Sequence, residues 1–131
     1  MTFKLKISEG ELEGNKNFKN EDGNHECAVF VQQAAGAPNV TIWKKGDNVM
    51  KSALGSILKG TVISTFDAQG HYPIEKGKKH AAVYISHSDN GIKVYDQWND
   101  QGMVKSRTIH SDLKLLRKYV NRAENFFVVE T

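Results

Sequence analysis

The chain contains 131 residues, of which 39% are hydrophobic and 25% are charged, and its formal net charge at pH 7 is +3. This length and composition predict one globular domain that spans residues 1–131 and buries a hydrophobic core without an internal disulfide, which a chain with one cysteine cannot form. The weak positive charge excludes an extended nucleic-acid-binding surface, and no apolar run approaches the roughly 20 residues that a membrane-spanning helix needs.

Residues 1–24 carry many charged and amide side chains and few large apolar ones. We predict a short extended arm, with Phe3, Leu5 and Ile7 as its apolar positions, that leads into a polar loop. The arm lacks the apolar core of a cleaved signal peptide. We therefore expect the protein to be made in the cytoplasm and to reach any other compartment by a route that needs no such signal.

Residues 26–35 predict a helix, because they contain no proline or glycine and are followed by Gly36 and Pro38, which favour a helix end. Cys27, the only cysteine, then lies in the first turn. Unpaired backbone N–H groups and the positive end of the helix dipole stabilise a thiolate at that position. Cys27 is therefore a candidate nucleophile. The alternative is a small buried apolar residue, since free cysteine is among the most buried residue types.

The next segments carry loop, helix and strand signals in turn. Residues 37–46 are loop-like, with Trp43 as an anchor against the body of the domain. Asp47 can cap a short helix over residues 47–54. Residues 60–66 are rich in β-branched side chains and predict a strand.

The clearest local signal is a β-hairpin. Two runs of alternating apolar residues, 80–87 and 92–98, flank an Asn-Gly pair, which is the strongest short-range signal for a hairpin turn. If residues 87 and 92 close the hairpin, His80 and Asp96 lie near its open end. A third strand is predicted over residues 103–109.

The remainder of the chain predicts a weak helix over residues 112–120 and a closing strand over residues 125–130. With one clear helix and several strands joined by short turns, the expected fold class is α+β.

Asp96 is the unusual residue of the hairpin. Period-two alternation places Asp96 and Trp98 on the apolar face of their strand, where an unpaired carboxylate is costly to bury. His80 on the neighbouring strand is the partner within reach. Gln97 is the alternative partner for His80, although alternation places it on the opposite face. No metal is expected, because the Cys-x-x-Cys and His-x-x-x-His spacings of zinc sites are absent from the sequence.

A cysteine opens a helix in segment 26–28, a histidine begins a strand in segment 80–82, and an acid lies on the next strand in segment 96–98. In this order, and with the strand over 60–66, the chain resembles the papain-like, NlpC/CHAP-type cysteine amidohydrolases of bacteria, and is similar to the amidase effectors of type VI secretion. The resemblance covers residues 23–129. It implies an N-terminal helix packed on a twisted antiparallel β-sheet, with the active groove between them.

The resemblance also implies hydrolysis of amide bonds in peptidoglycan stem peptides, without a cofactor. Cys27 would attack as the thiolate, His80 would serve as base and then acid, and Asp96 would orient the imidazole. Gln97 and Trp98 are candidates for substrate binding. From the same resemblance we expect delivery to a periplasm by a signal-independent route. We also expect a cognate inhibitor (immunity) protein as a partner. The alternative is a non-catalytic module on this fold that binds a peptide or a partner protein in the groove.

Overall fold

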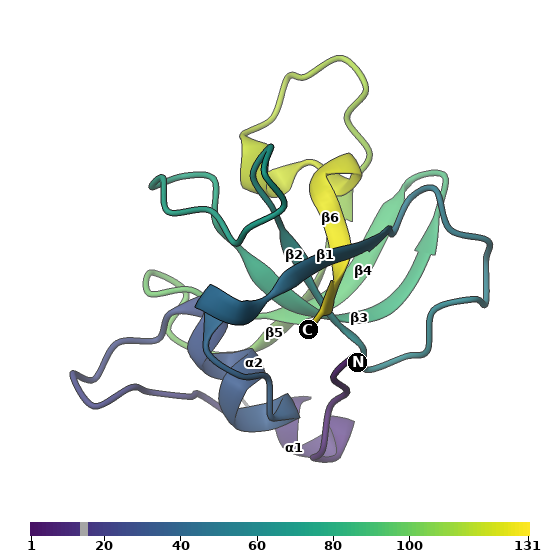
Figure 1. The fold of residues 1–131 in the computed structure, drawn as a ribbon. Coiled ribbons are helices and arrows are strands. Elements are labelled where there is room, and N and C mark those ends of the chain that lie inside the picture. Colours follow the sequence, from purple (N-terminus) through teal and green to yellow (C-terminus); the bar gives the residue numbers. More distant parts are fainter. Residues whose placement is uncertain (14–15) are drawn as a thin grey trace.

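The computed structural model describes residues 1–13 and 16–131, which are drawn in Figure 1. These residues contain a six-stranded antiparallel sheet in the order β1-β6-β2-β3-β4-β5. The elements are the α-helices α1 (Glu9–Glu13) and α2 (Cys27–Ala35), the 3₁₀ helices η1 (Val40–Ile42), η2 (Tyr119–Asn121) and η3 (Ala123–Asn125), and the strands β1 (Lys44–Asn48), β2 (Val62–Thr65), β3 (Ala81–Ser88), β4 (Gly91–Asp96), β5 (Lys105–His110) and β6 (Phe126–Glu130). Among them, no helix is both long and apolar enough to cross a membrane.

Helix α2 covers one face of the sheet and confirms the helix predicted over residues 26–35. Its buried side chains include Phe30, Val31 and Ala34, which share a core with strand residues such as Val83. Gly36 ends the helix in the left-handed region, at φ 68°, and its N–H reaches the carbonyl oxygens of the last turn. Because α2 is fixed at this end and along its buried side, its first residue, Cys27, has a defined position at the other end.

The opposite face of the sheet carries a second apolar core. Ile63, Ile92, Val94 and Ile109 lie on this face and pack with Phe126. The sheet is therefore buried on both sides, which agrees with the fully buried pattern of β2. The second core extends to the end of β4, where Asp96 begins the candidate site.

The hairpin predicted from the Asn-Gly pair is confirmed as β3 and β4. His87 lies opposite Ile92 and Ser88 lies opposite Gly91, as the expected register requires. A shift of one residue between Tyr84 and Ser86 then changes the pairing toward the open end. The strands predicted over residues 103–109 and 125–130 are confirmed as β5 and β6.

The prediction for residues 37–54 was wrong at two points. Strand β1 replaces the end of the predicted loop, and turns follow it instead of the helix predicted over residues 47–54. The cause is tertiary pairing, because β1 pairs with β6, which is distant in sequence. Asn48 also donates a side-chain hydrogen bond to the carbonyl of Glu124 at 2.9 Å. Trp43 is 1% exposed, so the predicted anchor is confirmed.

The helix predicted over residues 112–120 was also wrong. The backbone forms a loop up to the short helix η2, because both carboxylate oxygens of Asp112 accept backbone N–H groups, those of Leu116 and Arg117. Leu115 has a φ of 56°, which interrupts a right-handed helix.

Among the described residues of the first 24, α1 is a helix that the sequence did not indicate. Before it, Lys4 forms an antiparallel bridge with Thr61 at the edge of β2, so this part of the arm is extended. Residues 14–15 of the predicted polar loop lie outside the described residues.

Candidate active site

Cys27 is the first residue of α2, as its place in the predicted helix required. Glu26 precedes it with an extended backbone and provides no side-chain cap to the helix. The N–H groups of the first turn are therefore not satisfied by a capping side chain, and they lie beside the half-buried Cys27 thiol. A helix N-terminus of this kind favours the anionic form of a thiol.

His80 immediately precedes β3, and it lies on the same face of the sheet as Ala82. Its backbone N–H donates to the hydroxyl oxygen of Thr65 at 3.0 Å, which fixes the start of the strand against β2. Its ring Nε2 lies 2.7 Å from Oδ2 of Asp96, the last residue of β4. His80 is 6% exposed and Asp96 is 0% exposed, so this contact is shielded from solvent. The structure thus brings together Cys27, His80 and Asp96, which the sequence singled out.

The electrostatics of this group favour an ion pair between Cys27 and His80. Burial raises the pKa of the Cys27 thiol, but the hydrogen bond and the charge of His80 outweigh burial and bring the pKa below its ordinary value. Burial lowers the pKa of His80, but the hydrogen bonds and charges of Asp96 and Cys27 raise it to about 9. Both directions favour the charged pair of thiolate and imidazolium over the neutral pair.

Tyr72 is a second neighbour of the thiol. Its hydroxyl oxygen lies 3.5 Å from Sγ of Cys27. Burial and the negative charge of Cys27 raise the pKa of Tyr72, so the hydroxyl keeps its proton and can donate a hydrogen bond. The sequence contained no signal for this residue, because the loop over residues 66–79 lacks the regular periodicity that would place a side chain.

Arg107 on β5 is a further residue of the site that the sequence analysis missed. Its Nε donates to Oδ2 of Asp96 at 2.8 Å, and its Nη1 donates to Oδ1 of Asn121 at 3.2 Å. Val94 lies opposite Arg107 in the pairing of β4 with β5, so Arg107 shares the sheet face of Asp96. The signal was present in part, because period-two alternation from the apolar Ile109 places Arg107 on the buried face.

The candidate site borders a cleft of about 520 Å³. Cys27, His80 and Trp98 line it, together with Tyr72 and the exposed side chains of Lys76 and Lys79. Trp98 is half-buried, and the guanidinium carbon of Arg107 lies 5.1 Å from the centre of its ring. The cleft is large enough for a peptide segment and has the thiol in its wall.

Gln97 is not part of this cleft wall. It is fully buried, and its amide group accepts from the N–H of Phe18 at 3.1 Å and donates to the carbonyl oxygens of Phe18 and Glu26 at 2.9 and 3.1 Å. It points away from the cleft, as strand alternation predicted, and connects β4 to the start of α2. Its place is therefore structural, in contrast to the substrate contact expected from the sequence.

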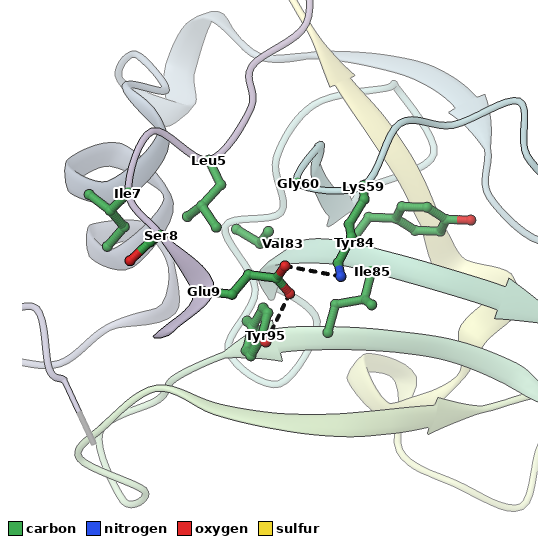
Figure 2. A pocket seen from close by; sticks show the side chains of 10 residues that line it. All are labelled: Leu5, Ile7, Ser8, Glu9, Lys59, Gly60, Val83, Tyr84, Ile85 and Tyr95. Carbon is green, nitrogen blue, oxygen red and sulfur yellow. Dashed lines mark hydrogen bonds and ion pairs between the residues drawn. The ribbon is translucent and has the colours of Figure 1, made fainter. Parts of the chain in front are cut away.

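A smaller cavity has a volume of about 280 Å³ and shares no lining residue with the cleft. Figure 2 shows the side chains that line it. At its centre, Glu9 of α1 pairs with Lys59 at 3.0 Å and accepts from the hydroxyl of Tyr95 at 3.0 Å. The Glu9 carboxylate thus interacts with two side chains of the same chain. The cavity lies where α1 packs against the sheet. Within the described part of the chain, no group of three or more His, Cys, Asp or Glu residues is placed to hold a metal ion.

The chain is similar to known proteins both in sequence and in fold. The sequence model of the family described as domesticated amidase effector 2 matches residues 7–129. A domesticated amidase effector 2 from Ixodes scapularis is 33% identical over 108 residues, which cover 80% of this chain and 70% of that protein. The solved structure of type 6 secretion amidase effector 2 (Tae2) is similar, with a TM-score of 0.73 and 27% identity over 95% of this chain and 94% of that chain. The predicted α+β, papain-like fold and the resemblance to type VI amidase effectors are both confirmed.

Proposed function

The chain belongs to the domesticated amidase effector 2 family, a family of amidase effectors, and from this membership we propose that it is a cysteine amidohydrolase that cleaves peptidoglycan stem peptides. The observation that carries the proposal is the contact of 2.7 Å between His80 and Asp96 beside the thiol of Cys27, at the wall of an open cleft. In this proposal, Cys27 serves as the nucleophile, His80 as the base and Asp96 as the orienting acid that amide hydrolysis needs.

In the proposed reaction, the Cys27 thiolate attacks the carbonyl carbon of the scissile amide and forms a C–S bond. His80 gives its proton to the leaving amine as the C–N bond breaks, which leaves a thioester on Cys27. The neutral imidazole then takes a proton from water as the water attacks the thioester. The acid product leaves, and the thiolate and the imidazolium are restored. No cofactor takes part in these steps.

The oxyanion of each tetrahedral intermediate needs hydrogen-bond donors that are already oriented. The backbone N–H of Cys27, at the unsatisfied start of α2, is one candidate. The Tyr72 hydroxyl is the second candidate, since it keeps its proton and lies 3.5 Å from Sγ. The Tyr72 hydroxyl is also placed to donate to a thiolate at Cys27, so we propose that it stabilises negative charge both before and after the attack.

Two cations at the cleft favour an acidic peptide. Lys76 and Lys79 line the cleft with exposed side chains, and neither forms an ion pair with any described residue. Peptidoglycan stem peptides carry free carboxylates near their amide bonds, and a lysine ammonium attracts such a group. The position of Lys76 and Lys79 at the cleft therefore supports peptidoglycan peptides as the substrate class.

The direct test is incubation of purified sacculi with the protein, followed by identification of the released fragments by mass. We expect new amine and carboxyl ends at one stem-peptide amide, and no such ends with the Cys27→Ala variant. A non-catalytic binding module, which is the alternative function, would bind sacculi without releasing fragments.

The place of action is part of the same proposal. We propose that the protein meets its substrate in a periplasm and that a cognate inhibitor protein covers the cleft in a producing cell. Export of the protein behind an added signal peptide should lyse bacteria, and the Cys27→Ala variant should not. Harmless export of the folded, active protein would contradict this location.

A further inference from the structure

Residues 111–118, here called the leucine loop, connect β5 to η2 and protrude from the body of the domain as the yellow-green segment at the top of Figure 1. Three of its side chains are apolar and face solvent, since Leu113, Leu115 and Leu116 are 81%, 69% and 82% exposed. Single exposed leucines are common on protein surfaces, but three within four residues at the end of one loop form a patch.

The leucine loop is held in one conformation by its own base. The carboxylate of Asp112 accepts the N–H groups of Leu116 and Arg117 at 3.1 and 2.6 Å. Glu124 fixes the start of the loop, where it accepts the Ser111 hydroxyl at 2.6 Å and the Asp112 N–H at 2.7 Å. These bonds hold the exposed leucines in place, and the exposure is therefore a property of the fold rather than of a loose segment.

Backbone strain also indicates that the fold determines the conformation of the leucine loop. Leu115 has a φ of 56°, the left-handed region that residues other than glycine seldom adopt, and among the described residues it is the only non-glycine residue with positive φ. Strain of this kind persists where the surrounding contacts determine it, and it is concentrated at functional segments.

The charge of the loop's outer surface is positive. Lys114, Arg117 and Lys118 are exposed among the leucines. The acidic groups of the base turn inward, because Asp112 is 8% exposed and both oxygens of Glu124 accept hydrogen bonds from the loop. The surface thus combines projecting leucines with cations, and lacks an exposed carboxylate between residues 113 and 118.

We propose that the leucine loop docks the protein on the surface of an anionic lipid bilayer. The leucines would enter the boundary between headgroups and acyl chains, and the lysine and arginine side chains would lie at the level of the anionic headgroups. The charge argues against two other occupants. A second copy would place identical cations against each other, and the centre of a protein–protein interface is typically depleted of lysine. Docking does not depend on the proposed hydrolysis, and it can be measured on the Cys27→Ala variant.

The test is flotation of the Cys27→Ala variant of this 131-residue chain with vesicles of pure phosphatidylcholine and with vesicles that contain about 30% phosphatidylglycerol. We expect binding to the anionic vesicles only, with a loss of at least about tenfold in affinity for Leu113→Ser/Leu116→Ser and for Lys114→Gln/Lys118→Gln. Leu115→Gly removes the third leucine at a backbone position that glycine favours, so it should fold and also weaken binding.

Matched controls come from the same chain. Leu54 and Leu58 are 72% and 60% exposed outside the loop, and Lys51 and Lys93 are exposed lysines elsewhere. Leu54→Ser/Leu58→Ser and Lys51→Gln/Lys93→Gln should bind anionic vesicles within about twofold of the parent protein. The proposal is overturned if the controls lose as much affinity as the loop variants, or if anionic vesicles are not bound. It is equally overturned if the loop leucines mediate dimerisation, or binding to lipid-free sacculi, in place of vesicle binding.

Discussion

Arg107 and His80 contact the same oxygen atom. Nε of Arg107 lies 2.8 Å and Nε2 of His80 lies 2.7 Å from Oδ2 of Asp96, and Nη2 of Arg107 lies 3.5 Å from Nε2 of His80. The carboxylate is thus shared between two basic groups. Its attraction for the imidazolium is opposed by the guanidinium, which is permanently charged.

Arg107→Gln tests this sharing. Loss of the guanidinium should raise the pKa of His80, because the imidazolium loses a repulsive neighbour and no longer shares Asp96. The alkaline limb of the pH profile of kcat/KM should then move to higher pH, and kcat/KM near neutrality should fall by about tenfold as the orientation of Asp96 is lost. Arg107→Lys keeps the charge and should preserve the alkaline limb. If the alkaline limb of the pH profile is unchanged in Arg107→Gln, Arg107 contributes to the stability of the fold and does not influence the pKa of His80.

Substitutions of Cys27, His80 and Asp96 should lower the activity by different amounts. Cys27→Ala should lower kcat by at least about ten-thousandfold with the fold intact, since alanine suits the first turn of α2. His80→Ala should be nearly as damaging, whereas Asp96→Asn should cost about a hundredfold, because an amide can still accept from His80 but stabilises the imidazolium less. Turnover of a soluble stem-peptide fragment measures all three. Effects that simply add in the double variants would contradict their action as one unit.

The reactivity of Cys27 should depend on pH in a predictable direction. Because the pKa of Cys27 is below its ordinary value, alkylation by iodoacetamide should remain fast at pH values where an ordinary thiol is protonated. The rate should fall only as the pH drops through the lowered pKa. His80→Ala removes the hydrogen bond and the charge that lower the pKa, so its alkylation should need higher pH. In the active enzyme, kcat/KM should decline as the pH rises through about 9, where His80 loses its proton.

Gln97→Ala should destabilise the protein rather than act as a neutral change. The buried amide group forms three hydrogen bonds that join β4 to the N-terminal loop and to the carbonyl of Glu26. Their loss should lower the free energy of unfolding by about 2–4 kcal/mol. Denaturant unfolding measures this loss, and Gln69→Ala, at an exposed turn position, is the matched control.

Charge reversal at the cleft should affect substrate binding. Lys76→Glu/Lys79→Glu should raise KM by about tenfold for a stem peptide with free carboxylates and change kcat little, since these side chains line the cleft and take no part in the proposed proton transfers. Lys78→Glu is the control, because Lys78 lies between them in sequence but pairs with Glu75 and lines a different hollow. An equal rise in KM for Lys78→Glu would indicate a general effect of charge. A substrate with amidated carboxylates should be insensitive to all of these changes.

The sequence predicted the elements whose signals are local. The Asn-Gly turn determined the hairpin, and period-two alternation then separated Asp96 from Gln97 correctly, so His80 and Asp96 were placed within reach of each other. Helix α2 was predicted from the absence of helix breakers before Gly36. Each of these inferences used residues that are neighbours in sequence or across one tight turn.

Most of the features that were missed depend on contacts between residues that are distant in sequence. Strand β1 has mostly polar residues and forms because β6 is beside it, so no local pattern marks it. Arg107 needed the register between β4 and β5, and Tyr72 needed the path of an irregular loop. Leu115 belongs to a segment with helical composition, whose helix is prevented by the bonds of Asp112. Tertiary pairing outweighed local propensity at β1, whereas around Leu115 the local bonds from the side chain of Asp112 outweighed helix propensity.

Cys27 is the only cysteine in the chain, and the hydrogen bond and charge of His80 outweigh burial and lower the pKa of its thiol, which favours the thiolate form. Peroxide converts such a thiolate to a sulfenic acid, which many enzymes protect by condensing it with a second, resolving cysteine. This chain has no second cysteine, so the sulfenic acid must be reduced by an external thiol or proceed to the irreversible sulfinic acid. In an oxidising environment, the proposed activity of each molecule should therefore depend on the balance between peroxide and small thiols around it.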